Sequence, residues 1–370
     1  MITLIRALAG TAVGAVVSLG ATAQTASLSY EFATLSGVTP SAVNNAGLIG
    51  GTTFSIEDTQ AALGRAGSMG LLGGCPCDAS AFGETEGRGL NDLGWLVGTY
   101  SYGRGAFLYR DGQMQDLSPT NMPSPDRNTA NAIDDAGVVV GQARFQGASG
   151  SHAYVATDGH YLDLGTLGGA ASDATAINNA GDVVGWSQDA SGASHAFLYS
   201  GQTFTDLGTF GGRSAVAVDI NDRGVIAGYR DVGLPGAPSW RSFLYDHGSI
   251  VELGALDGPS IKVSALNDRG DAVGSFDQGA FLYHDGELIA LNGLIAPEQA
   301  ALYVLTGASD INDDGTIVGS AAVGGGPRDA GFVLTPSIPE PSVVASMLVG
   351  LLALGGARLV RRRARSAPRP

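Results

Sequence analysis

The chain has 370 residues, of which 35 are acidic and 20 are basic, and its formal net charge is −15. Such an acidic surface repels the phosphates of nucleic acid, so we expect no nucleic-acid partner. Glycine is frequent, at 57 residues, which indicates many tight turns and closely packed strands rather than long helices.

The first 23 residues have the layout of a secretory signal peptide. Arg6 supplies a positive charge, an apolar stretch covers residues 7–19, and small residues follow at Ala21-Thr22-Ala23. We therefore expect export, with cleavage after Ala23 and a mature chain that begins near Gln24.

A short element, Asn/Asp-x-x-Gly, recurs seven times in the mature chain at intervals of 43 to 47 residues. A period near 45 with four strand-like pieces per unit is typical of a propeller blade rather than a helical array. The glycines of the seven copies are Gly47, Gly94, Gly137, Gly181, Gly224, Gly270 and Gly315.

The fourth unit shows the expected strands of a blade most clearly. Strands a, b, c and d are expected at 173–178, 182–187, 195–200 and 203–207. Asn178-Asn179-Ala180-Gly181 joins a to b with the chemistry of a type I turn, because Gly accepts the left-handed position that follows.

The two ends of the repeat array complement each other. The seventh unit offers strands a, b and c and ends at Pro336, whereas a d-like strand at 28–35 precedes the first unit. If 28–35 pairs with 331–334, the ring closes and exposes no open sheet edge. We therefore predict an all-β fold, a β-propeller of seven four-stranded blades over 24–336. A six-bladed ring and a β-solenoid are the alternatives.

The last 34 residues, 337–370, combine three parts in a fixed order. Pro339, Glu340 and Pro341 precede an apolar run at 343–360, and an arginine-rich tail follows. About 18 apolar or small residues approach the minimum for a transmembrane helix. Because arginines resist translocation, we expect the tail on the cytoplasmic side and the preceding domain outside.

This order of parts resembles the PEP-CTERM sorting signal. The resemblance implies recognition by an exosortase-type enzyme in the membrane, which removes the helix and the tail. It also implies delivery to the cell surface or extracellular matrix of an exopolysaccharide-producing Gram-negative bacterium. A plain C-terminal membrane anchor is the alternative.

The repeat units carry a second resemblance. Asp-Leu-Gly-Thr-Leu-Gly-Gly at 163–169, the stretch 176–185 and His195-Ala196-Phe197 are similar to the HAF repeat of extracellular bacterial proteins. The first unit departs from the pattern, because Ala61-Ala62-Leu63 stands where His-Ala-Phe is expected. The resemblance implies a secreted repeat protein and no specific activity.

Cys75 and Cys77 flank Pro76 between the first and second units. A disulfide is the default in an exported protein, although a bridge across one residue is strained and easily reduced. A free dithiol and pairing with a second chain stay open.

Asp310, Asn312 and Asp314 follow the spacing of a calcium loop and resemble the loops of integrin-like propellers. The fourth and fifth units lack this set of ligands at the equivalent positions, so the feature shared by all units is the turn. We keep these three residues as a weak calcium candidate and expect no cofactor and no other metal.

We expect no catalytic residues, because the chain has no nucleophile elbow, no His-Glu-x-x-His and no phosphate loop. His152 and His195 occupy equivalent positions in two units, which indicates a structural role with a ring nitrogen bonded to a nearby turn. Two carboxylates from different blades can still meet at a ring centre, and the sequence does not exclude this.

A ligand is expected on the b–c and d–a loops, where the units differ most. Aromatic and arginine side chains suit sugars or a protein partner. The candidates are Tyr100, Tyr102, Arg104, Arg144 and Trp240.

The sequence therefore predicts an exported, non-catalytic surface or matrix protein that binds within an exopolysaccharide matrix. The alternative is a propeller hydrolase or lyase that acts on polysaccharide. Carboxylates and histidines clustered at the ring centre would favour the enzyme, and a channel poor in such residues would favour the binding protein.

Overall fold

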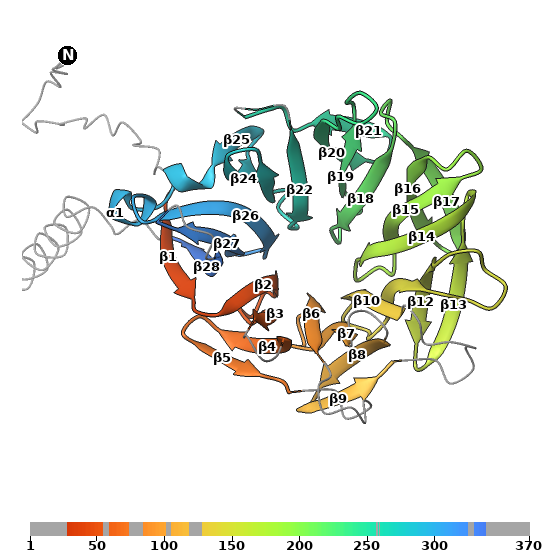
Figure 1. Ribbon diagram of the computed structural model, residues 1–370, viewed down its shortest axis with the longest axis horizontal. Coiled ribbons are helices and arrows are strands. Elements are labelled where there is room, and N and C mark those ends of the chain that lie inside the picture. The colour runs from red at the N-terminus through yellow and green to blue at the C-terminus, as the bar shows by residue number, and fades with distance from the viewer. Residues whose placement is uncertain are drawn as a thin grey trace, which may run out of the picture. The chain divides into compact units, whose positions relative to one another are not determined.

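The computed structural model describes residues 28–54, 59–73, 84–100, 105–117, 128–256, 258, 260–324 and 329–337. In these ranges the strands form seven antiparallel four-stranded sheets arranged as the blades of a ring (Figure 1). The predicted seven-bladed propeller is thus confirmed, and the six-bladed ring and the solenoid are excluded. The expected signal peptide (1–23) and the expected tail (337–370), apart from Ser337, lie outside the described residues.

Each blade runs from strand a on the inside to strand d on the outside. Blade 1 contains β2 (Val38–Val43), β3 (Ile49–Phe54), β4 (Thr59–Arg65) and β5 (Ser68–Leu71); blade 2, β6 (Thr85–Leu90), β7 (Leu96–Tyr100), β8 (Gly105–Arg110) and β9 (Gln113–Asp116); blade 3, β10 (Asn128–Ile133), β11 (Val139–Ala143), β12 (His152–Thr157) and β13 (His160–Gly165); blade 4, β14 (Gly168–Ile177), β15 (Val183–Asp189), β16 (Ser194–Ser200) and β17 (Thr203–Gly208).

The remaining elements complete the ring. Blade 5 contains β18 (Ala215–Ile220), β19 (Ile226–Asp231), β20 (Trp240–Asp246) and β21 (Ser249–Glu252); blade 6, β22 (Ile261–Leu266), β23 (Ala272–Phe276), β24 (Gly279–His284) and β25 (Glu287–Ala290); blade 7, β26 (Tyr303–Ile311), β27 (Ile317–Val323), β28 (Asp329–Pro336) and the N-terminal β1 (Tyr30–Leu35). Two short helices, η1 (Leu291–Gly293) and α1 (Pro297–Ala300), connect β25 to β26. Among the residues described, no helix is both long and apolar enough to cross a bilayer.

The N-terminal strand closes the ring as the sequence predicts. β1 lies antiparallel to β28, with Leu35 opposite Gly331 and Tyr30 opposite Pro336, so the pairing extends beyond the expected 331–334. The Ser337 N–H donates to the Ser29 carbonyl at 2.9 Å. The chain therefore enters and leaves the ring at one point, on the side of the turns between strands a and b.

Strand b of every blade contains a glycine that a close approach to strand a requires. In blade 4 the register shifts between Ala174 and Ala176, and Gly185 lies opposite this irregularity. A Cβ at Gly185 would lie 2.0 Å from the Asp173 carbonyl oxygen and 2.9 Å from the Phe197 ring. Any larger residue would displace the strand or the ring, so this position excludes side chains.

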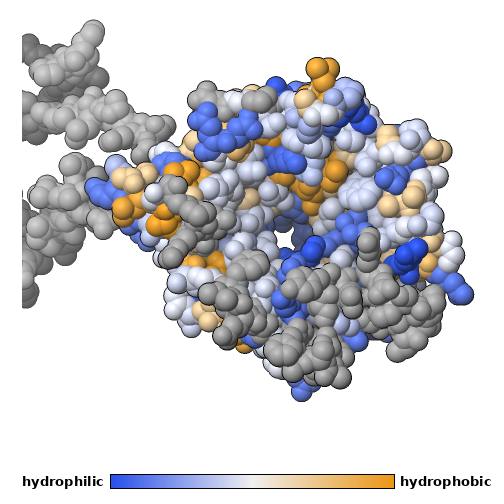
Figure 2. Space-filling view, viewed as in Figure 1, coloured by the Kyte–Doolittle hydropathy of each residue, from blue (hydrophilic) through white to orange (hydrophobic). Residues whose placement is uncertain are grey.

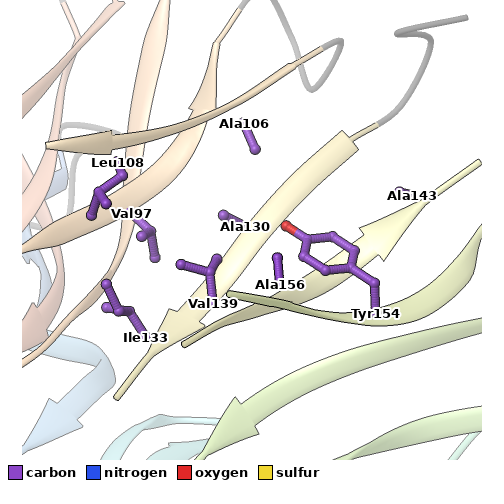
Figure 3. Close-up of a cluster of buried hydrophobic side chains, with 9 residues drawn as sticks. All are labelled: Val97, Ala106, Leu108, Ala130, Ile133, Val139, Ala143, Tyr154 and Ala156. Atoms are coloured by element: carbon purple, nitrogen blue, oxygen red, sulfur yellow. The ribbon is translucent and has the colours of Figure 1, made fainter. Parts of the chain in front are cut away.

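The aromatic residue of the repeated His-Ala-Phe element fills the centre of six of the seven blades, where Phe107, Tyr154, Phe197, Phe243, Phe281 and Phe332 are fully buried. In blade 1 the register places Ala62 opposite Gly51, as Phe197 lies opposite Gly185, so Ala62 and not Leu63 takes this position. Neighbouring blades then pack on these cores: Figure 3 shows Val97 and Leu108 of blade 2 near Ile133 and Val139 of blade 3. Apolar strands covered on both faces give such interfaces between sheets.

We predict that Leu35→Ala in β1 lowers the free energy of unfolding by about 2–5 kcal/mol, because it removes a buried side chain from the strand that closes the ring. Chemical denaturation of the purified domain measures this change. Thr34→Ala, an exposed position of the same strand, is the control and is expected to stay within about 0.5 kcal/mol of the unsubstituted protein. Equal effects at the two positions would contradict the closing role of β1.

Candidate functional site

Residues from all seven blades meet at the central channel, which is therefore the first candidate site. The a strands β2, β6, β10, β14, β18, β22 and β26 surround the ring centre, and the space-filling view shows an opening there (Figures 1 and 2). We call the end of the channel at the turns between strands a and b the turn face. The opposite end, which carries the b–c and d–a loops, is the loop face.

The channel on the turn face is encircled by a continuous ring of hydrogen bonds. Each a–b turn donates its second residue's N–H to the side-chain oxygen of the same residue in the next blade, over 2.8–3.0 Å. All seven blades take part, so the ring is complete. Its members, which we call the outer Asx ring, are Asn45, Asp92, Asp135, Asn179, Asp222, Asp268 and Asp313.

The first residues of the same turns form a second ring, the inner Asx ring. Here each Asn Oδ1 accepts a backbone N–H of its own turn, and each Nδ2 donates to the first turn residue's carbonyl in the next blade at 2.9–3.1 Å. Asn is suited to this position because one amide supplies both the acceptor and the donor. The members are Asn44, Asn91, Asp134, Asn178, Asn221, Asn267 and Asn312.

Asp134 breaks the inner Asx ring at one junction. Its Oδ1 still accepts the Val138 N–H at 2.7 Å, but a carboxylate has no N–H for the carbonyl of Asn178 in the next blade. Burial raises the pKa of Asp134, although backbone N–H donors from its turn oppose the shift. The blade 3–blade 4 junction therefore lacks one of the hydrogen bonds found at the other six.

The turn face is acidic but its carboxylates are engaged in holding blades together. The two rings enclose a cavity of about 170 Å³, lined by the ring residues and by the apolar residue before each turn. Burial and the neighbouring carboxylates of Asp313 and Asp222 raise the pKa of Asp268. Among the described residues, no group of three His, Cys, Asp or Glu side chains is placed to hold a metal ion.

The calcium candidates have separate partners. Both Asp310 oxygens accept backbone N–H groups, from Val43 in the next blade at 2.7 Å and from Ile311 at 2.8 Å. Asn312 belongs to the inner Asx ring, and Asp314 lies 3.9 Å from the Arg269 guanidinium. Calcium binding by these residues stays a prediction.

Two carboxylates in the channel wall each link one blade to the next. Asp219 accepts the N–H of Leu266 in blade 6, just as Asp310 accepts that of Val43 in blade 1. Desolvation raises the pKa of Asp219 to about 6 and that of Asp310 to about 7, and the Asp219 charge adds to the shift at Asp310. These carboxylates are thus bound to backbone donors in a poorly solvated wall.

A third carboxylate, Asp173 of blade 4, belongs to a polar chain that runs through blades 2, 3 and 4. Asn131 donates to the Asp173 Oδ1 at 2.8 Å and accepts from Arg88 at 3.3 Å, and Arg88 lies 3.5 Å from Glu86. Burial raises the pKa of Asp173 to about 7, against the opposing effects of Arg88 and Asn131. A carboxyl group in a channel with such a pKa is a candidate proton donor.

The histidines do not join these carboxylates. All five lie on c or d strands or in the turn between them, in the outer half of the blades. His152 Nδ1 lies 3.0 Å from Asp163, and His195 Nδ1 lies 3.0 Å from Asp206. The partner is thus the Asp side chain of strand d, where the sequence had suggested a turn.

Trp240 is the predicted loop residue with the most developed surroundings. Its ring meets Tyr229 edge-on at 5.2 Å, and the Lys262 ammonium lies 4.1 Å from the Trp240 centroid and 5.0 Å from that of Tyr229. All three side chains are half-buried. We call them the aromatic–lysine cluster; it joins blades 5 and 6 on the loop face.

The other predicted site residues are dispersed. Tyr100 donates to Asp116 at 3.1 Å on blade 2, and Arg144 is exposed on blade 3. The structure brings neither of them to Trp240. Tyr102, Arg104, Cys75, Cys77 and the sorting motif Pro339, Glu340 and Pro341 lie outside the described residues.

Tyr229 and Lys262 were not singled out as site residues by the sequence. Tyr229 begins residues 229–241, the longest b–c connection among the seven units, and Lys262 is the only lysine of the chain. The occurrence of a single lysine was the only sequence feature that pointed to Lys262. That Lys262 lies next to Tyr229 follows from the contact between blades 5 and 6.

No family model matches the sequence, and no curated protein does. Among solved structures, the β-propeller domain of the Trilobed protease from Pyrococcus furiosus is similar, with a TM-score of 0.51, 11% identity, and coverage of 83% of this chain and 98% of that one. A Mycobacterium tuberculosis puromycin-hydrolyzing peptidase has a TM-score of 0.50, 13% identity, and coverage of 82% and 53%.

TolB from Acinetobacter baumannii is a third similar structure, with a TM-score of 0.43, 12% identity, and coverage of 84% and 63%. The chain spans less than two thirds of the length of TolB and of the peptidase. At these identities the likeness shows the propeller fold alone.

We predict that Asp134→Asn stabilises the protein by about 0.5–1.5 kcal/mol, because the new Nδ2 completes the inner Asx ring with a hydrogen bond to Asn178. Denaturant titration at neutral pH measures the change. The reciprocal variant Asn91→Asp removes an existing bond of the same ring and is expected to destabilise. A loss of stability in Asp134→Asn would show that the blade 3–blade 4 junction does not follow the geometry of the others.

We predict that the free energy of unfolding rises as the pH falls from about 8 to about 5. The folded-state pKa of Asp173 is about 7, above the ordinary 3.8, so the folded protein holds a proton that the unfolded chain releases in this window. The Asp219 and Asp310 carboxyls act in the same direction. Denaturation at a series of pH values measures the slope.

Asp173→Asn is expected to reduce this slope, because the amide does not titrate and its oxygen still accepts from Asn131. Asp158→Asn, in an exposed hairpin turn, removes the same charge and is the control. Identical slopes in the two variants would contradict the role of Asp173.

Proposed function

We propose that this chain is an exported, non-catalytic propeller that binds carbohydrate at the cell surface or within an exopolysaccharide matrix. The observation that carries the proposal is the aromatic–lysine cluster of Tyr229, Trp240 and Lys262 on the loop face. Indole and phenol rings offer apolar faces to sugar rings, and the ammonium donates hydrogen bonds to hydroxyl or carboxyl oxygens.

The position of the termini supports this use of the loop face. Ser29 and Ser337 are hydrogen-bonded at the turn face, so any attachment through either end of the domain leaves the loop face free. A surface-bound propeller then presents Trp240 away from its point of attachment.

The channel carboxylates also support a binding role. Asp219 and Asp310 each accept two backbone N–H groups and hold neighbouring blades together, so their oxygens serve the ring itself. A catalytic pair needs carboxylates free to exchange protons with a substrate. Asp173 is the observation that favours the alternative, a polysaccharide hydrolase or lyase, because its raised pKa suits a general acid.

Export rests on the sequence. The signal-peptide layout of residues 1–23 and the order of Pro339-Glu340-Pro341, apolar run and arginines support secretion followed by sorting by an exosortase-type partner. In this proposal the membrane is a transient partner through the C-terminal helix, before processing releases the propeller.

A glycan array of neutral and anionic polysaccharides, probed with residues 24–336, tests the proposal. We expect binding that falls at least tenfold in Trp240→Ala. Trp95→Ala is the matched control, because Trp95 is also half-buried and also lies under a cation, Arg110 at 5.4 Å, but follows an a–b turn at the turn face.

Equal losses in Trp240→Ala and Trp95→Ala would assign the effect to stability rather than to the loop face. Release of new reducing or unsaturated ends from a bound polysaccharide, abolished by Asp173→Asn, would favour the enzyme over the binding protein.

A further inference from the structure

A second cavity, of about 500 Å³, lies against blade 7 where blades 6 and 1 flank it. This volume falls within the range of about 300–1,000 Å³ that is usual for small-molecule sites. Six hydroxyl side chains from strands a and b of three blades line the cavity, together with small apolar residues. The hydroxyl residues are Ser41, Ser264, Ser275, Thr306, Ser309 and Ser320.

The cavity exists because blade 7 departs from the repeat. Gly307 lies five residues before Asn312, a position that carries a side chain in every other blade, such as Asp173 in blade 4 and Lys262 in blade 6. A Cβ at Gly307 would have one neighbour within 4 Å, the Ser275 Cβ at 3.7 Å. The missing side chain therefore leaves open space.

A second position of the repeat enlarges this space. Three residues before the inner Asx ring, blades 2 and 3 carry Arg88 and Asn131, which bond to each other across the channel wall. Blades 6 and 7 carry Ser264 and Ser309 there instead. Blade 7 thus carries small residues at both repeat positions, Gly307 and Ser309, and its neighbour blade 6 carries Ser264 at the second of them. All three residues line the cavity.

Most hydroxyls of the cavity are available to a ligand. Ser41 donates to the carbonyls of Gly87 and Gly50, and Thr306 donates to the carbonyl of Ser320. Within the described part of the protein, the hydroxyls of the other four serines form no hydrogen bond with another residue. Each of these can donate one hydrogen bond and accept two.

The chemistry of the lining indicates an uncharged polar ligand. No Asp, Glu, Lys, Arg or His side chain lines the cavity, so nothing there compensates a charge on a ligand. The mature domain is itself strongly acidic, which disfavours an anion over long range. A compact molecule with many hydroxyl groups satisfies both conditions.

Strand pairing in blade 6 links the cavity to the aromatic–lysine cluster. Ser275, which lines the cavity, lies opposite Lys262 in the β22–β23 ladder. The Lys262 ammonium in turn lies over the Trp240 ring. One short oligosaccharide can therefore follow blade 6 from the cavity to the Trp240 ring.

We propose that this cavity binds one neutral sugar unit of a polysaccharide whose adjoining units contact the aromatic–lysine cluster. The proposal rests on the carbohydrate-binding function above and adds the position and the charge class of the bound unit. Gly307 makes the room, and the serine hydroxyls of blades 6 and 7 hold the sugar.

Saturation-transfer NMR and calorimetry on residues 24–336 test the proposal, with neutral oligosaccharides (cellotriose, maltotriose and mannotriose) and trigalacturonate as probes. We expect at least one neutral probe to bind and trigalacturonate to bind at least tenfold more weakly. Gly307→Leu is expected to abolish binding, because the Leu side chain occupies the part of the cavity next to Ser275, where the sugar is proposed to lie, and Gly307 has no positive φ that would strain it.

Two further variants separate loss of the site from loss of the fold. Gly293→Leu introduces the same side chain where a Cβ meets nothing within 4 Å, and it is expected to bind normally. Ser264→Ala combined with Ser309→Ala removes two hydroxyls without filling the cavity, and it is expected to weaken binding at least tenfold. This pair decides the question if Gly307→Leu does not fold.

The outcomes distinguish the two proposals. Neutral probes that still bind Gly307→Leu but not Trp240→Ala would overturn the cavity as a site and leave the carbohydrate-binding function standing. Tighter binding of trigalacturonate than of the neutral probes would contradict the proposal that the bound sugar unit is uncharged. Absence of binding to every probe and every arrayed polysaccharide would overturn both proposals.

Discussion

The antiparallel pairing of β1 with β28 is the contact on which the ring depends. It joins Leu35 to Gly331 and Tyr30 to Pro336, whereas every other blade forms from one continuous stretch of chain. Closing so long a loop costs conformational entropy once, and the cost grows only slowly with loop length. Closure then lets the outer Asx ring run from blade to blade around the turn face without an end, and it lets Asn312 of blade 7 bond to blade 1 in the inner Asx ring, which is interrupted at Asp134.

The blades and their closure were predictable because the signals for them are local. Each a–b turn is encoded by four consecutive residues, such as Asn178-Asn179-Ala180-Gly181. The seventh unit lacks a d strand, which can be seen by counting the strands in each unit. The inner Asx ring was not predictable, since the partner of the Asn178 amide is a carbonyl one full period away. The hydrogen bond that Asp134 cannot make would likewise go to a carbonyl one period away, that of Asn178. A change from Asn to Asp in this turn therefore looks neutral in the sequence and is costly in the folded ring.

The candidate site was predictable only in part, for a related reason. Trp240 stands out in the longest b–c loop, but Tyr229 and Lys262 acquire meaning through the contact between blades 5 and 6. Gly307 was least visible of all, because one more glycine among 57 carries no signal. Its importance appears when the blades are superposed by their turn residues and the other six show side chains.

A closed ring of similar blades presents the same side chains at every blade. A single binding site therefore requires that some blades differ in sequence. The positions that keep the ring closed repeat faithfully, as in the complete outer Asx ring. The positions that face the channel above that ring vary: a polar chain ends at Asp173 on one wall, and Gly307 with its serines hollows the other. Because a change at these channel positions leaves the turn hydrogen bonds intact, the fold tolerates asymmetry there. We infer that this separation lets a repetitive sequence carry one specific site.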